Sequence, residues 1–267
     1  MTPPSAASAG ISAGSGAAFV QALVAETLDR TDVLIAVRRH RDRHSCAAAP
    51  ALGPLLLPVS AMAGLLDALD SDRRTEPLDL VLVADTGLVE AAEARAVLLD
   101  DDRVALQGLH LTLPLDGPLA DSARLTLDTL DFALPAAIGV PRAPGWEGAL
   151  DVLAADGAEH ALLADPAADL RHCADFVVGC VRRGLAFHLG VGVAPTAALT
   201  GTAAALDAKE PAHVAALLVA GTSAQLAVLA DADPRSVRRR LVQVASATID
   251  DDVTALAALG LLAALEA

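Results

Sequence analysis

The chain has 267 residues, of which 54% are hydrophobic and 2% aromatic, and its formal net charge is -15. So few aromatic rings exclude stacking platforms for single-stranded nucleic acid, and the negative charge disfavours phosphate backbones and anionic membrane surfaces. The most apolar run, residues 253–265, is shorter than the ~20 residues of a membrane-spanning helix, and no signal peptide is indicated. We therefore expect a cytoplasmic protein with a small-molecule ligand, whose partners include neither nucleic acid nor membrane.

Low complexity marks residues 1–15, which we expect to be a disordered tail, and residues 16–267 are expected to form a single domain. In the first part of this domain, the hydrophobic pattern of the sequence predicts alternating helices and strands. The helices are expected at residues 16–29, 32–44, 60–69, 89–98 and 122–130, and the strands at residues 54–59, 78–84 and 104–113.

The stretch 134–193 shows strand, helix, strand, helix and strand with little between them, and its helices begin at residues 144–147 and 165–166. Consecutive βαβ units require a parallel sheet with helical cover. Further helices are expected at residues 197–206, 211–230 and 234–241, followed by a strand at 242–247 and a last helix from about Asp251.

The length suits one barrel of ~250 residues, so the expected fold class is α/β, a (β/α)8 TIM-barrel-like domain with extra N-terminal helices. Seven strands are predicted where a closed barrel needs one more. The barrel is therefore either incomplete or distorted, or one strand is hidden in a segment that reads as helical. An open doubly wound sheet is the alternative.

Two strands alternate cleanly between bulky apolar residues and small or polar ones. In residues 106–113 Leu109, Leu111 and Leu113 oppose His110, and in residues 186–193 Phe187 and Leu189 oppose His188. Because the bulky side chains are expected to pack against helices, His110 and His188 are predicted to point into the barrel. Two neutral imidazoles there could exchange protons with a carbonyl substrate or bind a metal. The alternative is a pair of core histidines bonded to the backbone.

Three aspartates, Asp85, Asp165 and Asp250, each follow a predicted strand, where a carboxylate can act as a base or hold a cation. Each also precedes a helix, and capping of that helix is the favoured interpretation. Asp85 and Asp165 join the two histidines as candidate catalytic residues.

Other motifs give weaker signals. Gly190 and Gly192 begin a string like a dinucleotide-binding loop, which makes them candidate cofactor-binding residues, but Pro195 occupies the place of the third glycine. No cofactor is identified from this. His40 and His44 have zinc-compatible spacing, yet charged neighbours favour a solvated helix face, and no metal site is predicted.

Cys173 and Cys180 lie seven residues apart in a predicted helix, roughly 10 Å by helical rise, so they can share neither a disulfide nor a metal ion. Both fall on the apolar stripe of that helix. We expect them to be packed in the core, because free Cys is among the most buried residue types.

Several strings, namely residues 140–147, 184–192, 212–220 and 257–262, resemble an uncharacterised group of actinobacterial (β/α)-barrel-type proteins. That group carries strand-end lysines, an Arg-Thr-Gly-Gly string and a His-His pair. Here the corresponding regions read Ala161 to Pro166 and His188 to Pro195, so those residues are missing. The resemblance thus implies a barrel but transfers no activity.

Two functions are consistent with these patterns. The first is a barrel enzyme of lyase or isomerase type that acts on a small polar metabolite through His110 and His188. The alternative is a non-catalytic barrel paralogue, a pseudoenzyme that serves as a subunit or ligand-binding partner. Either could form a homo-oligomer or associate with a homologue.

Overall fold

The computed structural model describes residues 13–28, 32–130, 134–165, 167 and 169–262. Within these residues eight parallel strands are hydrogen-bonded in chain order, and β8 pairs with β1 to close a barrel. The strands are β1 Val24–Thr27, β2 Leu52–Pro58, β3 Leu78–Val83, β4 Val104–Thr112, β5 Ala136–Gly139, β6 His160–Leu163, β7 Ala186–Leu189 and β8 Leu241–Ser246. The fold is a (β/α)8 barrel, as the sequence predicts.

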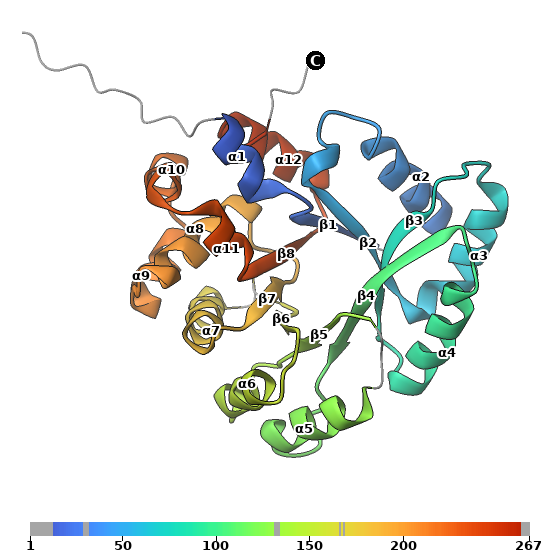
Figure 1. Ribbon diagram of the computed structural model, residues 1–267, viewed down its shortest axis with the longest axis horizontal. Helices are drawn as coiled ribbons and strands as arrows, with labels where there is room; N and C mark the ends of the chain where they lie inside the picture. Colours follow the sequence, from blue (N-terminus) through green and yellow to red (C-terminus); the bar gives the residue numbers. More distant parts are fainter. Residues whose placement is uncertain (1–12, 29–31, 131–133, 166, 168, 263–267) are drawn as a thin grey trace, which may run out of the picture.

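Helices surround the strands, and the longest connection, between β7 and β8, holds four of them on one side of the barrel (Figure 1). The helices are α1 Ala13–Val20, α2 Val33–Arg43, α3 Met62–Ser71, α4 Leu88–Leu99, α5 Leu119–Thr129, α6 Trp146–Ala155, α7 Leu170–Arg183, α8 Pro195–Leu206, α9 Pro211–Leu218, α10 Thr222–Asp231, α11 Pro234–Arg238 and α12 Ile249–Ala258. Two short 3-10 helices are η1 Ala49–Ala51 and η2 Val59–Ala61. None of the described helices is both long and apolar enough to cross a membrane.

The missing eighth strand is β1, which lies inside the segment 16–29 that we expected to be one helix. Helix α1 instead ends at Val20, the chain turns at Ala22 with a φ of +50°, and Val24 pairs with both Leu52 and Val244. The expectation was wrong because this short apolar run is compatible with both the helical and the strand period. Hydrogen bonding to a strand on each side favours the strand.

Several helix boundaries also differ from the sequence-based expectation, including the start of α5 at Leu119 instead of 122 and the end of α11 at Arg238 instead of 241. The helix expected at 165–166 begins at Leu170, because Asp169 caps it by accepting from the amides of Arg171 and His172; residue 166 lies outside the described residues. The helix expected at 211–230 divides before Gly221 into α9 and α10, and α12 begins at Ile249. Residues 13–15 of the expected tail belong to α1, while 1–12 lie outside the described part.

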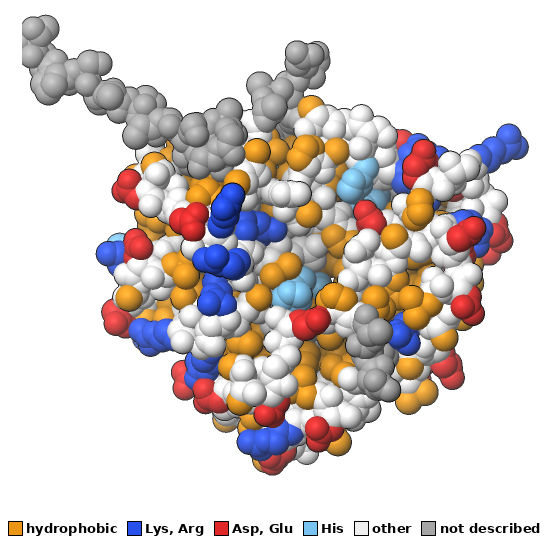
Figure 2. All heavy atoms as spheres, viewed as in Figure 1, with side chains coloured by type: hydrophobic (Ala, Val, Ile, Leu, Met, Phe, Trp, Pro, Cys, Tyr) orange, Lys and Arg blue, Asp and Glu red, His pale blue; other side chains and the backbone are white. Residues whose placement is uncertain are grey.

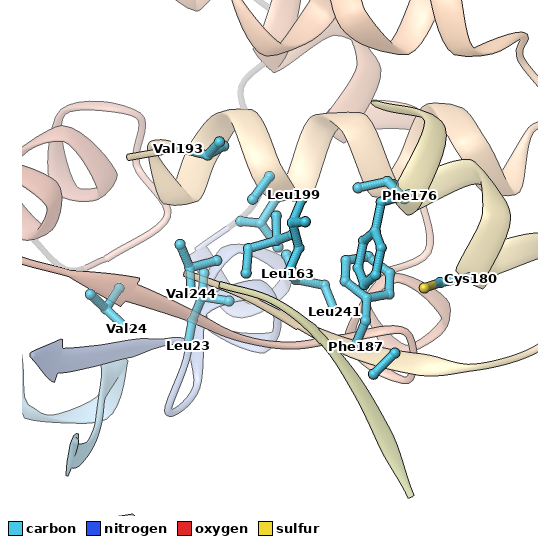
Figure 3. Packing of buried hydrophobic residues seen from close by; sticks show 14 of the residues in the cluster. Leu23, Val24, Leu163, Phe176, Cys180, Phe187, Val193, Leu199, Leu241 and Val244 are labelled. Carbon is cyan, nitrogen blue, oxygen red and sulfur yellow. The ribbon is translucent and has the colours of Figure 1, made fainter. Parts of the chain in front are cut away.

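The main hydrophobic core lies between the strands and the helical ring. Phe187 on β7 faces Phe176 on α7, with ring centroids 6.0 Å apart and planes at 89° (Figure 3). Cys173 and Cys180 on α7 are fully buried in this core, as predicted. Burying one such large apolar side chain contributes about 1.5–3 kcal/mol.

A second, smaller apolar cluster fills part of the barrel interior. It consists of Ala25, Leu56, Val81 and Ala245, with Val83 packed against it. These residues come from β1, β2, β3 and β8, so the apolar filling is on one side of the barrel. On the β4 to β7 side, the interior contains the polar side chains of His110, His160 and His188 together with Ala137 and Leu162.

Candidate functional site

His110 on β4 and His188 on β7 meet inside the barrel. Nε2 of His110 lies 3.2 Å from Nδ1 of His188, and the two rings are nearly perpendicular. Both side chains are buried, while Leu109, Leu111, Phe187 and other outward residues of these strands belong to the main core. The inward orientation predicted from alternation is confirmed, and the two histidines are hydrogen-bonded to each other.

Two further polar residues belong to this interior group, and we did not predict either. His160, the first residue of β6, places its ring centroid 4.9 Å from that of His188. Gln243 on β8 is the register partner of His188. Alternation along residues 160–163 places His160 and Leu162 on the inward face. Four residues are too few, however, to show a clear period in the sequence.

The histidines are electrically neutral at neutral pH. Burial lowers the pKa of His110 to about 4, with a smaller effect from His160. Burial, together with His110 and His160, holds the pKa of His188 well below its usual range, and the amide of Gln243 acts in the opposite direction. Because both rings are neutral, one donates its N–H and the other accepts in the bond between them.

A cavity of about 310 Å³ opens at the carboxyl ends of the strands, where barrel enzymes keep their chemistry. We call it the carboxyl-end cavity. It is mostly apolar, with Leu56, Val83 and Leu162 in its wall, and its polar side chains include His110, Asp85 and Thr112. His110 therefore reaches a solvent-connected space at the end of the barrel that the fold uses for catalysis.

An adjoining cavity of about 280 Å³ shares Thr112 and Ala164 with the carboxyl-end cavity. It adds charged and polar groups that follow β5 and β6, namely Arg142, Asp165, Asp169 and His172. Arg142 is paired with Asp169 at 2.6 Å, yet its side chain is 62% exposed. Arg142, which the sequence analysis did not predict, thus places a positive charge in the cavity that adjoins the carboxyl-end cavity.

The three predicted aspartates play different parts. Asp85 does not cap α4; it accepts hydrogen bonds from the amide and hydroxyl of Ser60 on η2. Asp165 is exposed in the adjoining cavity. Asp250 is on α12 and accepts two 2.9 Å hydrogen bonds from Arg43. Only Asp85 shares a cavity with His110.

Close packing explains Gly190 and Gly192 without a cofactor. A Cβ atom on Gly190 would lie 1.8 Å from the carbonyl oxygen of Ala164. Gly192 has a φ of +115°, and a Cβ there would lie 2.2 Å from that of Ala167. Gly190 also lines the carboxyl-end cavity, so binding of a cofactor by this loop stays a prediction.

His40 is not on a solvated helix face, contrary to expectation. Its side chain is 2% exposed, and Nδ1 lies 3.2 Å from the carboxylate of Glu26 on β1, which also pairs with Arg43. This face of α2 is directed at the barrel wall, where His40 and Arg43 contact the half-buried carboxylate of Glu26. Within the described residues no group of three or more His, Cys, Asp or Glu side chains is arranged to hold a metal ion.

Comparisons of the chain with protein-family models, with curated proteins and with solved structures give no significant match. The resemblance to the actinobacterial group therefore stays a prediction. Fold and site together define a class of architecture, a (β/α)8 barrel whose interior holds a hydrogen-bonded histidine pair.

Proposed function

We propose that the protein is an enzyme of the isomerase or lyase type that acts on a small carbonyl-containing metabolite in the carboxyl-end cavity. The observation that carries this proposal is the position of His110, which lines that cavity and is hydrogen-bonded at 3.2 Å to His188. A neutral imidazole held by a second imidazole is suited to donate a hydrogen bond to a carbonyl oxygen.

Asp85 is the candidate base. It lies two residues beyond Val83, the register partner of His110, and it lines the same cavity. In the proposed step its carboxylate removes a proton from the carbon next to the carbonyl, and the electron pair moves to the oxygen, which His110 stabilises. In an α-hydroxy carbonyl substrate, a proton passes from the hydroxyl to the former carbonyl oxygen, and return of the carbon-bound proton to the former carbonyl carbon completes an isomerisation. Where the β carbon carries a leaving group, the electron pair forms a double bond between the α and β carbons, the bond to the leaving group breaks, and that group takes up the proton in an elimination.

The remaining candidate residues assist these two. His188 is a positioning residue, because it orients the ring of His110 and selects its tautomer. Arg142, at 62% exposure, can take a negatively charged end of the substrate in the adjoining cavity that Asp165 also lines. The apolar wall of Leu56, Val83 and Leu162 excludes water from the reacting carbon.

Proton abstraction next to a carbonyl can be tested without knowing the substrate. The protein is incubated in D2O with pools of small aldehydes, ketones and keto acids, and solvent deuterium incorporation is read by NMR and mass spectrometry. We expect exchange in at least one compound, with a loss of 100-fold or more in Asp85→Asn and His110→Gln. Asp128→Asn, an exposed carboxylate on α5, is the matched control and retains exchange.

The absence of exchange in every pool, or equal exchange in Asp85→Asn and the native protein, would refute the assignment. His188→Gln gives a second readout. As a positioning residue it is expected to lower the exchange rate by less than His110→Gln and to shift the pH profile of exchange.

A specific observation favours the non-catalytic alternative. The residues that follow β6 and β7 in the carboxyl-end cavity are apolar or glycine, including Ala164 and Val191, and both carboxylate oxygens of Asp85 are already bonded to Ser60. A protein of this kind would bind the same carbonyl compounds without exchanging their protons. Calorimetric binding together with no deuterium incorporation would support this alternative.

A further inference from the structure

The two ends of the barrel interior differ in polarity. A cavity of about 400 Å³ at the amino ends of the strands has polar and charged side chains in its lining, among them His160, Arg238 and Gln243. We call it the amino-end cavity. Figure 2 shows basic side chains gathered over α11, next to a histidine in the hollow at the centre of this face. The carboxyl-end cavity, where the proposed reaction takes place, has the more apolar lining, and this restricts the kind of substrate that it can bind.

The apolar wall of the carboxyl-end cavity lies across the barrel from His110. In the closed barrel of eight strands, β8 is four places from β4 in either direction, so Ala245 on β8 is opposite His110 on β4. Leu56 and Ala245 belong to the small apolar cluster inside the barrel, and all three side chains line the cavity. A substrate whose carbonyl is bound by His110 therefore places its far end against an aliphatic surface.

The polar side chains of this lining have few free hydrogen-bonding groups. They are Thr27, Asp85, His110 and Thr112. The hydroxyl of Thr27 donates to the backbone carbonyl of Ser246 at 3.0 Å, and one nitrogen of His110 is taken by His188. Both carboxylate oxygens of Asp85 accept from Ser60. A sugar-like substrate would leave several of its hydroxyl groups unpaired against the aliphatic wall, which disfavours its binding.

The carboxyl-end cavity also offers no cation to a phosphate group. Within the described residues its lining contains neither lysine nor arginine, and Asp85 contributes a carboxylate. In the adjoining cavity Arg142 is paired with Asp169 at 2.6 Å, and Asp165 lines the same space. A phosphate ester carries a charge of about -1.5 to -2, whereas one arginine can match at most a single carboxylate. A phosphorylated substrate is therefore disfavoured.

The mouth of the carboxyl-end cavity is apolar as well. Val191, in the loop after β7, lines the cavity and is 40% exposed. Because β7 pairs with β8, a chain that lies against Ala245 can continue outward to Val191. Covering an exposed aliphatic side chain with a hydrocarbon group removes apolar surface from water and favours binding.

We propose that the substrate of the carboxyl-end cavity is an aliphatic carbonyl compound, an aldehyde, ketone or keto acid with a hydrocarbon chain and no phosphate group. The position of the carbonyl, beside His110 and Asp85, rests on the proposed function. The chain extends across the barrel to Leu56 and Ala245, and its end contacts Val191. The cavity volume of about 310 Å³ is at the small end of the range for small-molecule sites.

The test is a comparison of dissociation constants for the full chain, measured by ligand-observed NMR titration. The probes are 2-butanone, 2-hexanone and 2-octanone, with dihydroxyacetone and dihydroxyacetone phosphate as polar counterparts. We expect the dissociation constant to fall about fourfold for each buried methylene, and thus about 16-fold from 2-butanone to 2-hexanone. Both dihydroxyacetone compounds are expected to bind at least tenfold more weakly than 2-hexanone.

Two inward alanines provide a matched pair of variants. Ala245→Leu fills the space opposite His110 and is expected to weaken 2-hexanone at least tenfold but 2-butanone less than threefold. Ala137→Leu adds the same atoms to the amino-end cavity and should change neither more than twofold. If Ala245→Leu fails to fold, Val191→Thr at the exposed mouth decides. It is expected to weaken 2-octanone more than twofold and to leave 2-butanone unchanged.

No gain of affinity with chain length, tighter binding of dihydroxyacetone phosphate than of 2-hexanone, or equal losses in Ala245→Leu and Ala137→Leu would overturn the proposal. The deuterium exchange test has separate outcomes. Binding that depends on chain length without exchange of any ketone would refute the proposed reaction and retain the aliphatic ligand. Exchange confined to phosphorylated compounds would retain the reaction and refute the aliphatic substrate.

Discussion

Asp85 and Ser60 join the turns that follow β3 and β2. One carboxylate oxygen of Asp85 accepts from the Ser60 amide at 3.1 Å, and the other accepts from the Ser60 hydroxyl at 2.5 Å. The residue proposed as the base is thus held in place by its neighbour at the rim of the carboxyl-end cavity. The same contact gives it a structural role that can be measured separately.

We expect Asp85→Ala and Ser60→Ala each to lower the free energy of unfolding by about 1 kcal/mol at this exposed site, because Asp85→Ala removes both hydrogen bonds and Ser60→Ala removes the one from the hydroxyl. In a double-mutant cycle by urea denaturation the two losses should not add. Asp165→Ala, an exposed aspartate at the neighbouring rim, is the control and should stay within about 0.5 kcal/mol of the native protein. Additive losses would show that the contact does not stabilise the protein.

The buried histidines predict a loss of stability in mild acid. The pKa of His110 is about 4 in the folded chain against 6.5 as its ordinary value, so between these values the unfolded state binds the proton and the folded state does not. The unfolding free energy is therefore undiminished above pH 6.5 and falls as the pH drops toward 4, by about 3 kcal/mol for this residue. His188, whose pKa is also lowered, adds to the same trend.

Urea denaturation at pH 7.5 and pH 5.0 measures this effect. His110→Gln should reduce the difference between the two pH values by about 2 kcal/mol, because glutamine cannot take up the proton. His213→Gln, at an exposed position on α9, should leave the difference unchanged within about 0.5 kcal/mol. A pH dependence that survives in His110→Gln would contradict the expectation.

Gly190 is predicted to tolerate no side chain. Its Cβ would overlap the Ala164 carbonyl oxygen at 1.8 Å, and backbone cannot move aside as a flexible side chain does. Gly190→Ala should therefore lower the unfolding free energy by more than about 3 kcal/mol, measured by thermal or urea denaturation. Gly221→Ala is the control, because nothing lies within 4 Å of a Cβ there, and it should be near neutral. A Gly190→Ala protein of native stability would argue against this packing of β6 and β7.

The three cysteines should differ in reactivity. Cys46 is exposed, whereas Cys173 and Cys180 are fully buried, and burial raises the pKa of the Cys173 thiol to about 12. Because the thiolate is the reactive form, Ellman's reagent should modify one thiol quickly in the native protein and all three after denaturation. Cys46→Ser should abolish the fast phase. Rapid modification of two or three thiols in the native state would be the contrary result.

The sequence by itself determined which side of several elements is buried. Alternation in β4 and β7 oriented His110 and His188, and the stripe on α7 placed Cys173 and Cys180 in the core, because each pattern is set by the local backbone period. The same rule would have found His160, had the four residues of β6 been long enough to give a clear period.

Tertiary structure decided what local period does not encode. Residues 24–27 became a strand because β2 and β8, remote in the chain, offer hydrogen bonds on both sides. The bonds of Asp85 to Ser60 and the contact between His110 and His188 likewise depend on segments that are distant in the chain. The hydrophobic period of a helix or strand determines the face on which a side chain lies. The residues that the side chain contacts are determined only when the barrel closes.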